Sequence, residues 1–83
     1  MPQMYERLQR PWRASLGVAL IGTRAGEVKV IRSPAAEVWL ALEKAAPAID
    51  IASECLQMSS SMTHDSAERG LATLMAAGLA HTT

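Results

Sequence analysis

The sequence has few aromatic residues and only one cysteine. Phe is absent, and Tyr5, Trp12 and Trp39 are the only aromatic side chains among the 83 residues. Because Cys55 has no second cysteine to pair with, an intramolecular disulfide is excluded and a reducing compartment is favoured. The interior must therefore be built mainly from Ala, Leu, Val, Ile and Met, which supply most of the 49% apolar residues.

Long apolar segments are also missing. The apolar run 16–21 is far too short to span a bilayer, and the N-terminus lacks the charge, apolar stretch and small-residue cleavage site of a signal peptide. We therefore expect a cytoplasmic protein with no membrane partner. A chain of 83 residues has room for one core, so residues 1–83 are expected to form a single domain.

Motifs for catalysis and metal binding are absent as well. The chain contains no G-x-S-x-G, P-loop, Rossmann glycine pattern, H-E-x-x-H or C-x-x-C. His64 and Asp65 stand at an expected helix start, where surface and capping roles are the simpler interpretation. Cys55 is expected to be a small buried apolar residue, because no basic partner is close enough in the sequence to activate its thiol. We expect no enzymatic activity, no cofactor and no bound metal.

The charged residues are divided unevenly, although the net charge is zero. Residues 1–32 carry six basic and two acidic side chains, for a net charge of +4, whereas residues 33–83 carry a net charge of −4. A positive N-terminal half favours an anionic partner, such as an acidic peptide or a nucleic acid. A solvated basic surface without a partner is the alternative.

Two alternating segments predict a β-hairpin over residues 16–31. The first strand covers 16–23 and the second covers 27–31, and Gly26 in the turn suits a positive φ. Residues 1–13 form either an edge strand or a loose arm, and they are one possible source of the third strand that a hairpin needs. In the second strand, alternation puts Val28 and Val30 on one face, and Lys29 and Ile31 on the other.

Three helices are expected after the hairpin. The first covers 34–44, with Ser33 as N-cap, Pro34 at the first helical position and Glu37 near the positive helix end but off the apolar stripe. The second covers 47 or 48 to 57, and the third is capped by Thr63 or Asp65 and continues to about residue 77. Gly78 is the expected C-cap residue, Leu79 packs back after it, and residues 81–83 are expected to fray. The apolar stripes are Ala35, Val38, Trp39 and Leu42; Ile49, Ala52 (or Ser53) and Leu56; and Ala67, Leu71, Leu74 and Met75.

These elements predict an α+β fold: a small antiparallel hairpin or three-stranded sheet, followed by three helices that pack on one side of it. Two helices joined by a short turn make a helix-turn-helix-like element. An exposed strand edge in such a fold offers unpaired backbone groups to which an extended peptide can add. Peptide binding is therefore the function that these residues favour.

Several segments resemble the PqqD-like family of small winged-helix-type domains. They are the G-x-V-x-V second strand, the S-P-A-A-E-V-W helix start, the helix from Ile49 to Leu56 and the closing L-A-T-L-M-A-A-G-L. The resemblance covers residues 14–80, with departures at Val28-Lys29-Val30, where the family often has an aromatic residue, and at Arg32-Ser33, where it often has an Asn.

The resemblance implies a recognition element for ribosomally synthesised, post-translationally modified peptides. Such a domain binds the leader of a precursor peptide by β-strand addition and presents it to maturation enzymes. A free-standing chain of this size looks most like the leader-binding protein of lasso-peptide pathways, which works with a separate leader peptidase and a cyclase. The peptide-binding residues carried over are Val28, Lys29, Val30, Ile31, Arg32, Arg69, Ala72, Thr73 and Ala76.

Three alternatives remain open. A winged-helix DNA-binding protein would have nearly the same fold, but its recognition helix normally carries several Arg, Lys, Asn or Gln residues. The third helix expected here has Arg69 set against Asp65 and Glu68, so nucleic acid is the less favoured partner. The peptide chaperone of pyrroloquinoline quinone biosynthesis is similar in size, and a subunit-tethering module without peptide specificity is the third alternative.

Overall fold

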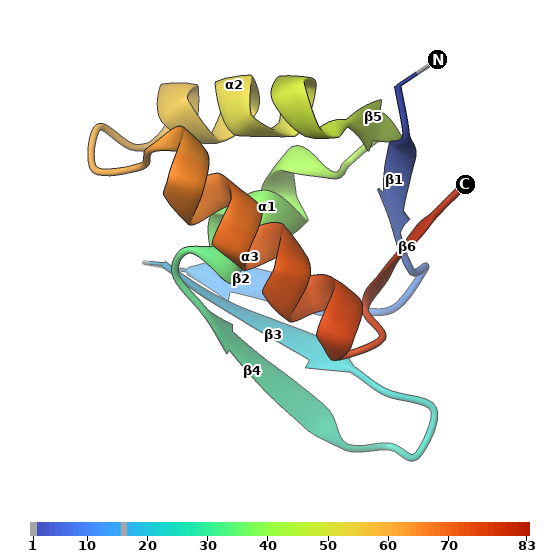
Figure 1. Cartoon of the computed structure of the whole chain (residues 1–83). Coiled ribbons are helices and arrows are strands. Elements are labelled where there is room, and N and C mark those ends of the chain that lie inside the picture. Colours follow the sequence, from blue (N-terminus) through green and yellow to red (C-terminus); the bar gives the residue numbers. More distant parts are fainter. Residues whose placement is uncertain (1, 16) are drawn as a thin grey trace.

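The computed structural model describes residues 2–15 and 17–83. Within these ranges the chain is α+β, with three helices and two small three-stranded antiparallel sheets (Figure 1). The expected α+β class is confirmed, and most of the strands precede the helices along the chain. No helix in the described ranges is long and apolar enough to cross a membrane.

The first sheet contains the expected hairpin. It has the strand order β2-β3-β4, from Trp12–Ser15, Val18–Gly22 and Val28–Arg32. The predicted first strand began at Leu16, which lies outside the described residues. Part of the N-terminal segment supplies the third strand, β2, which pairs antiparallel with β3.

The two faces of this sheet differ in burial. Ala19, Ile21 and Ile31 point to the helices and are buried. We call this side the inner face, and the opposite side, which carries Leu20 and Val30, the outer face. Alternation along the strands therefore separates a packed face from a face on which apolar side chains meet solvent.

The second sheet was not expected. It has the strand order β5-β1-β6, with β1 at Met4–Arg7, β5 at Ala46–Pro47 and β6 at Ala80–Thr82. The prediction of a frayed C-terminal tail is wrong, because His81 pairs with Glu6 across β1 and β6. The His81 Nε2 atom also lies 2.8 Å from the Glu6 Oε1 atom. Neither tail has a clear alternating pattern, so only their mutual pairing reveals these strands.

Helix α1, Ala35–Ala41, is shorter than the predicted 34–44. Ser33 does not cap it: its hydroxyl donates instead to the Glu37 carboxylate, and Pro34 precedes the first helical residue. Glu37 was expected off the apolar stripe, but it is buried, so its carboxylate needs this hydroxyl partner. The predicted stripe from Ala35 to Leu42 is buried as expected, and Trp39 is fully buried.

Helix α2, Ala48–Met58, has nearly the predicted bounds but a different buried face. Ile51, Ala52 and Cys55 are buried, whereas Ile49 is 68% exposed and Leu56 is 38% exposed. The prediction of Ile49 and Leu56 as core residues is therefore wrong. Apolar residues occur on both sides of this helix, so periodicity alone could not choose between them.

Helix α3, His64–Ala76, begins and ends with two side-chain and backbone motifs that the sequence indicated. The Thr63 hydroxyl accepts a hydrogen bond from the Ser66 amide in a capping box, which identifies Thr63 rather than Asp65 as the cap. At the other end, Gly78 has φ 72°. The Leu79 amide donates to the Leu74 carbonyl oxygen at 2.9 Å, as in a Schellman motif. Leu79 is buried, as predicted.

Candidate functional site

Strand β4 lies at the edge of the first sheet. It pairs with β3 along one edge, and no other described strand pairs with its second edge. Its pairing partner is β3, with Ile21 opposite Lys29 and Ala19 opposite Ile31. An antiparallel ladder alternates between residues that bond across it and residues whose N–H and C=O groups point the other way. The open side of β4 is therefore defined by which of its residues bond to β3.

The hydrogen bonds at the two ends of the ladder fix this alternation. The Thr23 amide donates to the Glu27 carbonyl oxygen at 2.9 Å, and the Ser33 amide donates to the Gly17 carbonyl oxygen at 3.0 Å. Counting inward in steps of two makes Lys29 and Ile31 the residues that bond to β3. The residues whose backbone N–H and C=O groups face the open side, here called the β4 edge, are Val28, Val30 and Arg32.

Helix α3 follows β4 along the inner face. At its C-terminal end, the Lys29 ammonium donates to the Ala77 carbonyl oxygen at 3.1 Å. Nearer its middle, Gly70 approaches so closely that an added Cβ atom would lie 2.9 Å from the Pro34 carbonyl oxygen, just beyond the end of β4. These two contacts place the C-terminal end of α3 near Lys29 and the middle of α3 near Pro34, just after β4 ends.

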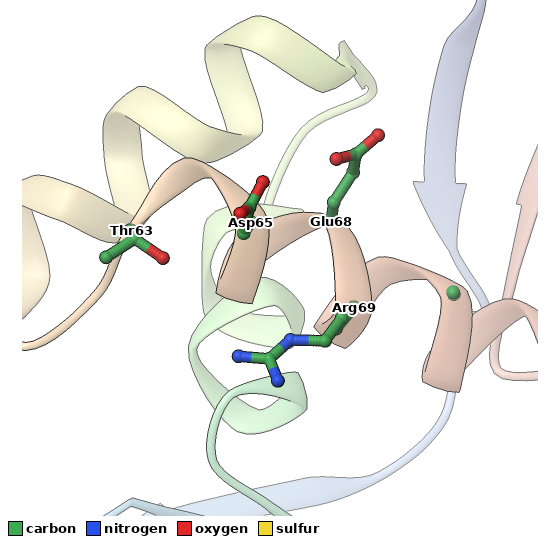
Figure 2. Close-up of a pocket in the computed structure, with 5 residues that line it drawn as sticks. Thr63, Asp65, Glu68 and Arg69 are labelled. Carbon is green, nitrogen blue, oxygen red and sulfur yellow. The ribbon is translucent and has the colours of Figure 1, made fainter.

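The two flanks of α3 have different surroundings. His64, Glu68 and Leu71 line a small apolar cavity with α2. Arg69, Thr73 and Ala76 recur at helical spacing on another flank of α3. In Figure 2 the Arg69 side chain points away from the Glu68 carboxylate. These three carried-over residues therefore do not line the cavity with α2.

Ala72, the fourth predicted helix residue, shares a surface feature with Arg69. Ala72 is exposed and lines a shallow hollow with Thr63, Asp65, Glu68 and Arg69, the four residues that Figure 2 labels. This hollow contains two carboxylates and one guanidinium, and its floor is the helix itself. Its openness to solvent and mixed charge make it a weak candidate for holding a ligand.

The predicted strand residues also fall into two groups. Val28, Lys29, Val30 and Arg32 are exposed and accessible from the β4 edge, whereas Ile31 is 7% exposed. Ile31 therefore belongs to the packed inner face and is hardly accessible to a partner. The structure brings the four exposed residues together on one strand and leaves Ile31 as part of the core.

The outer face of the first sheet carries an apolar patch, of which the sequence argument singled out Val28 and Val30 but not Leu20. Leu20 is 42% exposed, Val28 is 61% exposed and Val30 is 52% exposed, and Leu20 stands directly opposite Val30. Leu20 and Val28 also line a hollow of about 280 Å³. Exposed apolar residues in one contiguous patch are typical of a binding surface. The alternation already contained this patch, but which face would be open depended on where the helices packed.

Cys55 has no nucleophilic character in this fold. Its side chain is fully buried. Burial, together with the nearby Glu37 and Glu54 carboxylates, raises the pKa of the Cys55 thiol to about 11. A thiol with this pKa is almost entirely protonated at neutral pH, and the thiolate is the reactive form. The side chains of the described residues also form no group of three or more His, Cys, Asp or Glu that could hold a metal ion.

Comparison with known proteins gives no further identification. No family model, curated protein or solved structure matches this chain. The site is therefore interpreted from its own geometry: an unpaired strand edge, an apolar outer face beside it and a helix flank above its inner face.

Proposed function

We propose that this protein binds an extended peptide by β-strand addition at the β4 edge. The peptide is the leader of a ribosomally synthesised precursor, which the protein presents to a leader peptidase and a cyclase or another modifying enzyme. Lasso-peptide biosynthesis is the pathway that the sequence resemblance favours, and pyrroloquinoline quinone biosynthesis is the alternative. In this proposal the hairpin and the three helices correspond to a winged-helix-like recognition element.

The observation that carries the proposal is the open backbone ladder of β4. Val28, Val30 and Arg32 offer their N–H and C=O groups on a side where no described strand pairs. Unpaired groups in a row are the template for strand addition, in which main-chain hydrogen bonds supply affinity. Alternate side chains of the added strand would then meet the outer face and the α3 side in turn.

The distribution of charge supports a peptide over a nucleic acid. Basic side chains gather in the sheet half, including Arg32 at the end of β4, whereas exposed Asp65 and Glu68 accompany Arg69 on α3. A recognition helix that enters the DNA major groove would bring these carboxylates towards phosphates, which is unfavourable. An acidic peptide beside β4 has no such conflict.

A direct test is a fluorescence-anisotropy titration with two ligands. The first is a labelled leader peptide from the short open reading frame beside the gene, and the second is a labelled random DNA duplex. Both are titrated at a low and a near-physiological salt concentration. We expect saturable peptide binding that persists at the higher salt, because main-chain hydrogen bonds and apolar contacts are weakly screened.

The DNA titration tests the main alternative, a DNA-binding protein. Binding that rests on phosphate contacts falls steeply as salt rises. Salt-sensitive DNA binding without any peptide response would overturn the proposal and identify the fold as a nucleic-acid reader. Weak DNA binding that disappears at higher salt, together with peptide binding, agrees with the proposal.

A further inference from the structure

A second feature lies at the hairpin end of the first sheet, next to the β4 edge. There an open cavity of about 220 Å³ is lined by the hairpin turn, the β1–β2 connection and the residues after α3. We call it the hairpin-end cavity. Three of its lining residues are cationic, and none is acidic. The three cations are Arg10, Arg24 and Lys29.

The three cations of this cavity have no carboxylate partner in the described part of the chain. The ion pair found within 4.0 Å there joins His81 and Glu6, in the other sheet. Glu27 stands in the same hairpin but forms no ion pair with Arg24 or Lys29. Three like charges around one cavity repel one another, and an anion placed between them would relieve this repulsion.

Lys29 connects the cavity to the β4 edge. Its side chain lies on the inner face, where its ammonium donates one hydrogen bond to the Ala77 carbonyl oxygen. This bond uses one of three N–H donors and fixes the charge at the C-terminal end of α3, where exposed carbonyl oxygens favour a cation. The remaining two donors are available to a ligand in the cavity.

We propose that the hairpin-end cavity binds the carboxylate of an Asp or Glu side chain in the peptide that pairs with β4. This inference rests on the proposed strand addition. An added strand places its residues alternately on the inner and outer faces, and a residue opposite Lys29 points to the same face as Lys29. The bound peptide therefore carries an acidic residue at that inner position.

The neighbouring positions of the peptide follow from the same alternation. Residues on either side of the acidic one point to the outer face, beside Val28 and Val30. Both valines are more than half exposed, at 61% and 52%, so apolar peptide side chains gain contact there. The recognised segment is thus apolar, acidic and apolar in three successive residues.

The test uses synthetic peptides, because it needs one side chain changed at a time. The probes are short labelled peptides in which Val alternates with Thr, with one Thr replaced by Glu or by the uncharged isostere Gln. The replacement is placed at each Thr in turn, so that one peptide of the series carries it opposite Lys29 when the peptide pairs with β4. Dissociation constants are measured by anisotropy for the wild-type protein and for Lys29→Gln and Arg24→Gln.

The matched control is Arg13→Gln. Arg13 lies on β2 opposite Leu20, so it belongs to the outer face, and it is a basic residue that does not line the hairpin-end cavity. We expect the best Glu peptide to bind the wild type about fivefold more tightly than its Gln counterpart. This preference falls below about twofold in Lys29→Gln and is kept in Arg13→Gln.

The possible results separate this inference from the function on which it rests. Equal binding of Glu and Gln peptides, or equal loss of the preference in Arg13→Gln, overturns the acidic-residue site and leaves strand addition standing. If neither peptide binds and the leader peptide also fails to bind, the proposed function fails and this inference fails with it.

A second arm distinguishes a peptide carboxylate from a free anion. Inorganic phosphate is titrated against chloride at matched ionic strength, and the amide signals of Arg24 and Lys29 are followed by NMR. We expect phosphate alone to shift these signals less than the Glu peptide does. Phosphate shifts as large as those of the peptide would make the cavity a free-anion site and overturn the assignment to a peptide side chain.

Discussion

The guanidinium of Arg7 donates a 2.7 Å hydrogen bond to the carbonyl oxygen of Trp39 and lies 4.9 Å from the centre of its ring. It also lies 4.8 Å from the centre of the Trp12 ring, and the two indoles meet edge to face at 6.3 Å. Arg7 belongs to the second sheet, Trp12 to the first, and Trp39 to α1. The Arg7 side chain therefore connects the second sheet with the first sheet and with α1.

Removal of this side chain should weaken the whole domain. We expect Arg7→Ala to lower the free energy of unfolding by about 2 kcal/mol, because it removes a hydrogen bond to a charged donor and two cation–π contacts. Urea denaturation followed by Trp fluorescence measures the change. Arg10→Ala is the control, since within the described residues the Arg10 guanidinium hydrogen-bonds to the adjacent Gln9 carbonyl oxygen alone. Equal effects of the two substitutions would contradict the proposed joining role of Arg7.

The close approach of α3 to α1 predicts that Gly70 cannot be enlarged. A Cβ atom at this position would lie 2.8 Å from the Val38 Cγ2 atom and 2.9 Å from the Pro34 carbonyl oxygen. Although alanine favours a helix more than glycine does, we expect Gly70→Ala to lower the free energy of unfolding by about 2 kcal/mol. Thermal unfolding by circular dichroism measures this change. A rise in stability would show that the two helices can separate freely.

A proline substitution separates strand addition from charge-driven association. The Val30 amide faces the open side of β4, so Val30→Pro removes a donor to an added strand without breaking the β3–β4 ladder. We expect at least a tenfold loss in leader-peptide affinity with folding retained, from about 1.4 kcal/mol or more of lost hydrogen bonding and steric fit. Anisotropy and circular dichroism measure the two quantities.

The other edge of the same sheet offers the matched control for this substitution. The Gly22 amide donates to the Pro11 carbonyl oxygen at 2.8 Å, and the same two-residue alternation turns the Ala14 amide outward on β2. Ala14→Pro therefore introduces the same ring at an equivalent open position. If it weakens peptide binding as much as Val30→Pro does, the β4 edge is not the binding edge.

The buried Cys55 thiol predicts a loss of stability in alkaline solution. Its pKa is raised from 9.0 to about 11 by burial first and by the neighbouring carboxylates second. Between these values the unfolded chain releases the thiol proton while the folded chain retains it, so rising pH favours unfolding. The effect is absent well below pH 9 and reaches its full size above about pH 11.

The measurement compares wild type with Cys55→Ala across this pH range. Because other groups also titrate there, the quantity of interest is the difference in slope between the two proteins. We expect the free energy of unfolding to fall more steeply for the wild type. Parallel curves would show that the thiol ionises equally in the folded and unfolded chains.

The elements with strong local signals could be predicted from the sequence. The alternation in 18–31 predicts the hairpin, and Thr63 at one end and Gly78 at the other delimit α3. The capping box of Thr63 and the positive φ of Gly78 each involve only a few consecutive residues. They can therefore be predicted without knowing which distant segments pack nearby. Alternation separates Val28 and Val30 from Lys29 and Ile31, whereas the choice of this strand as the candidate site came from the family resemblance.

The features that the sequence did not reveal depend on distant contacts. The two outer strands of the second sheet form because β1 pairs with β5 and β6, whose residues lie far along the chain. The buried face of α2, which includes Ile51 and Cys55, depends on the helices α1 and α3 that pack against it. In each case the deciding partner is a packing neighbour, and local propensity carries no information about it.

For this protein, the sequence by itself determined the hairpin, the three helices and the alternation that separates Val28 and Val30 from Lys29 and Ile31. Tertiary structure alone decided which face of α2 became core, that β4 remained an open edge and that three cations met at one cavity. Periodicity arises from local backbone geometry, whereas burial, strand partners and the meeting of charges depend on segments brought together by folding.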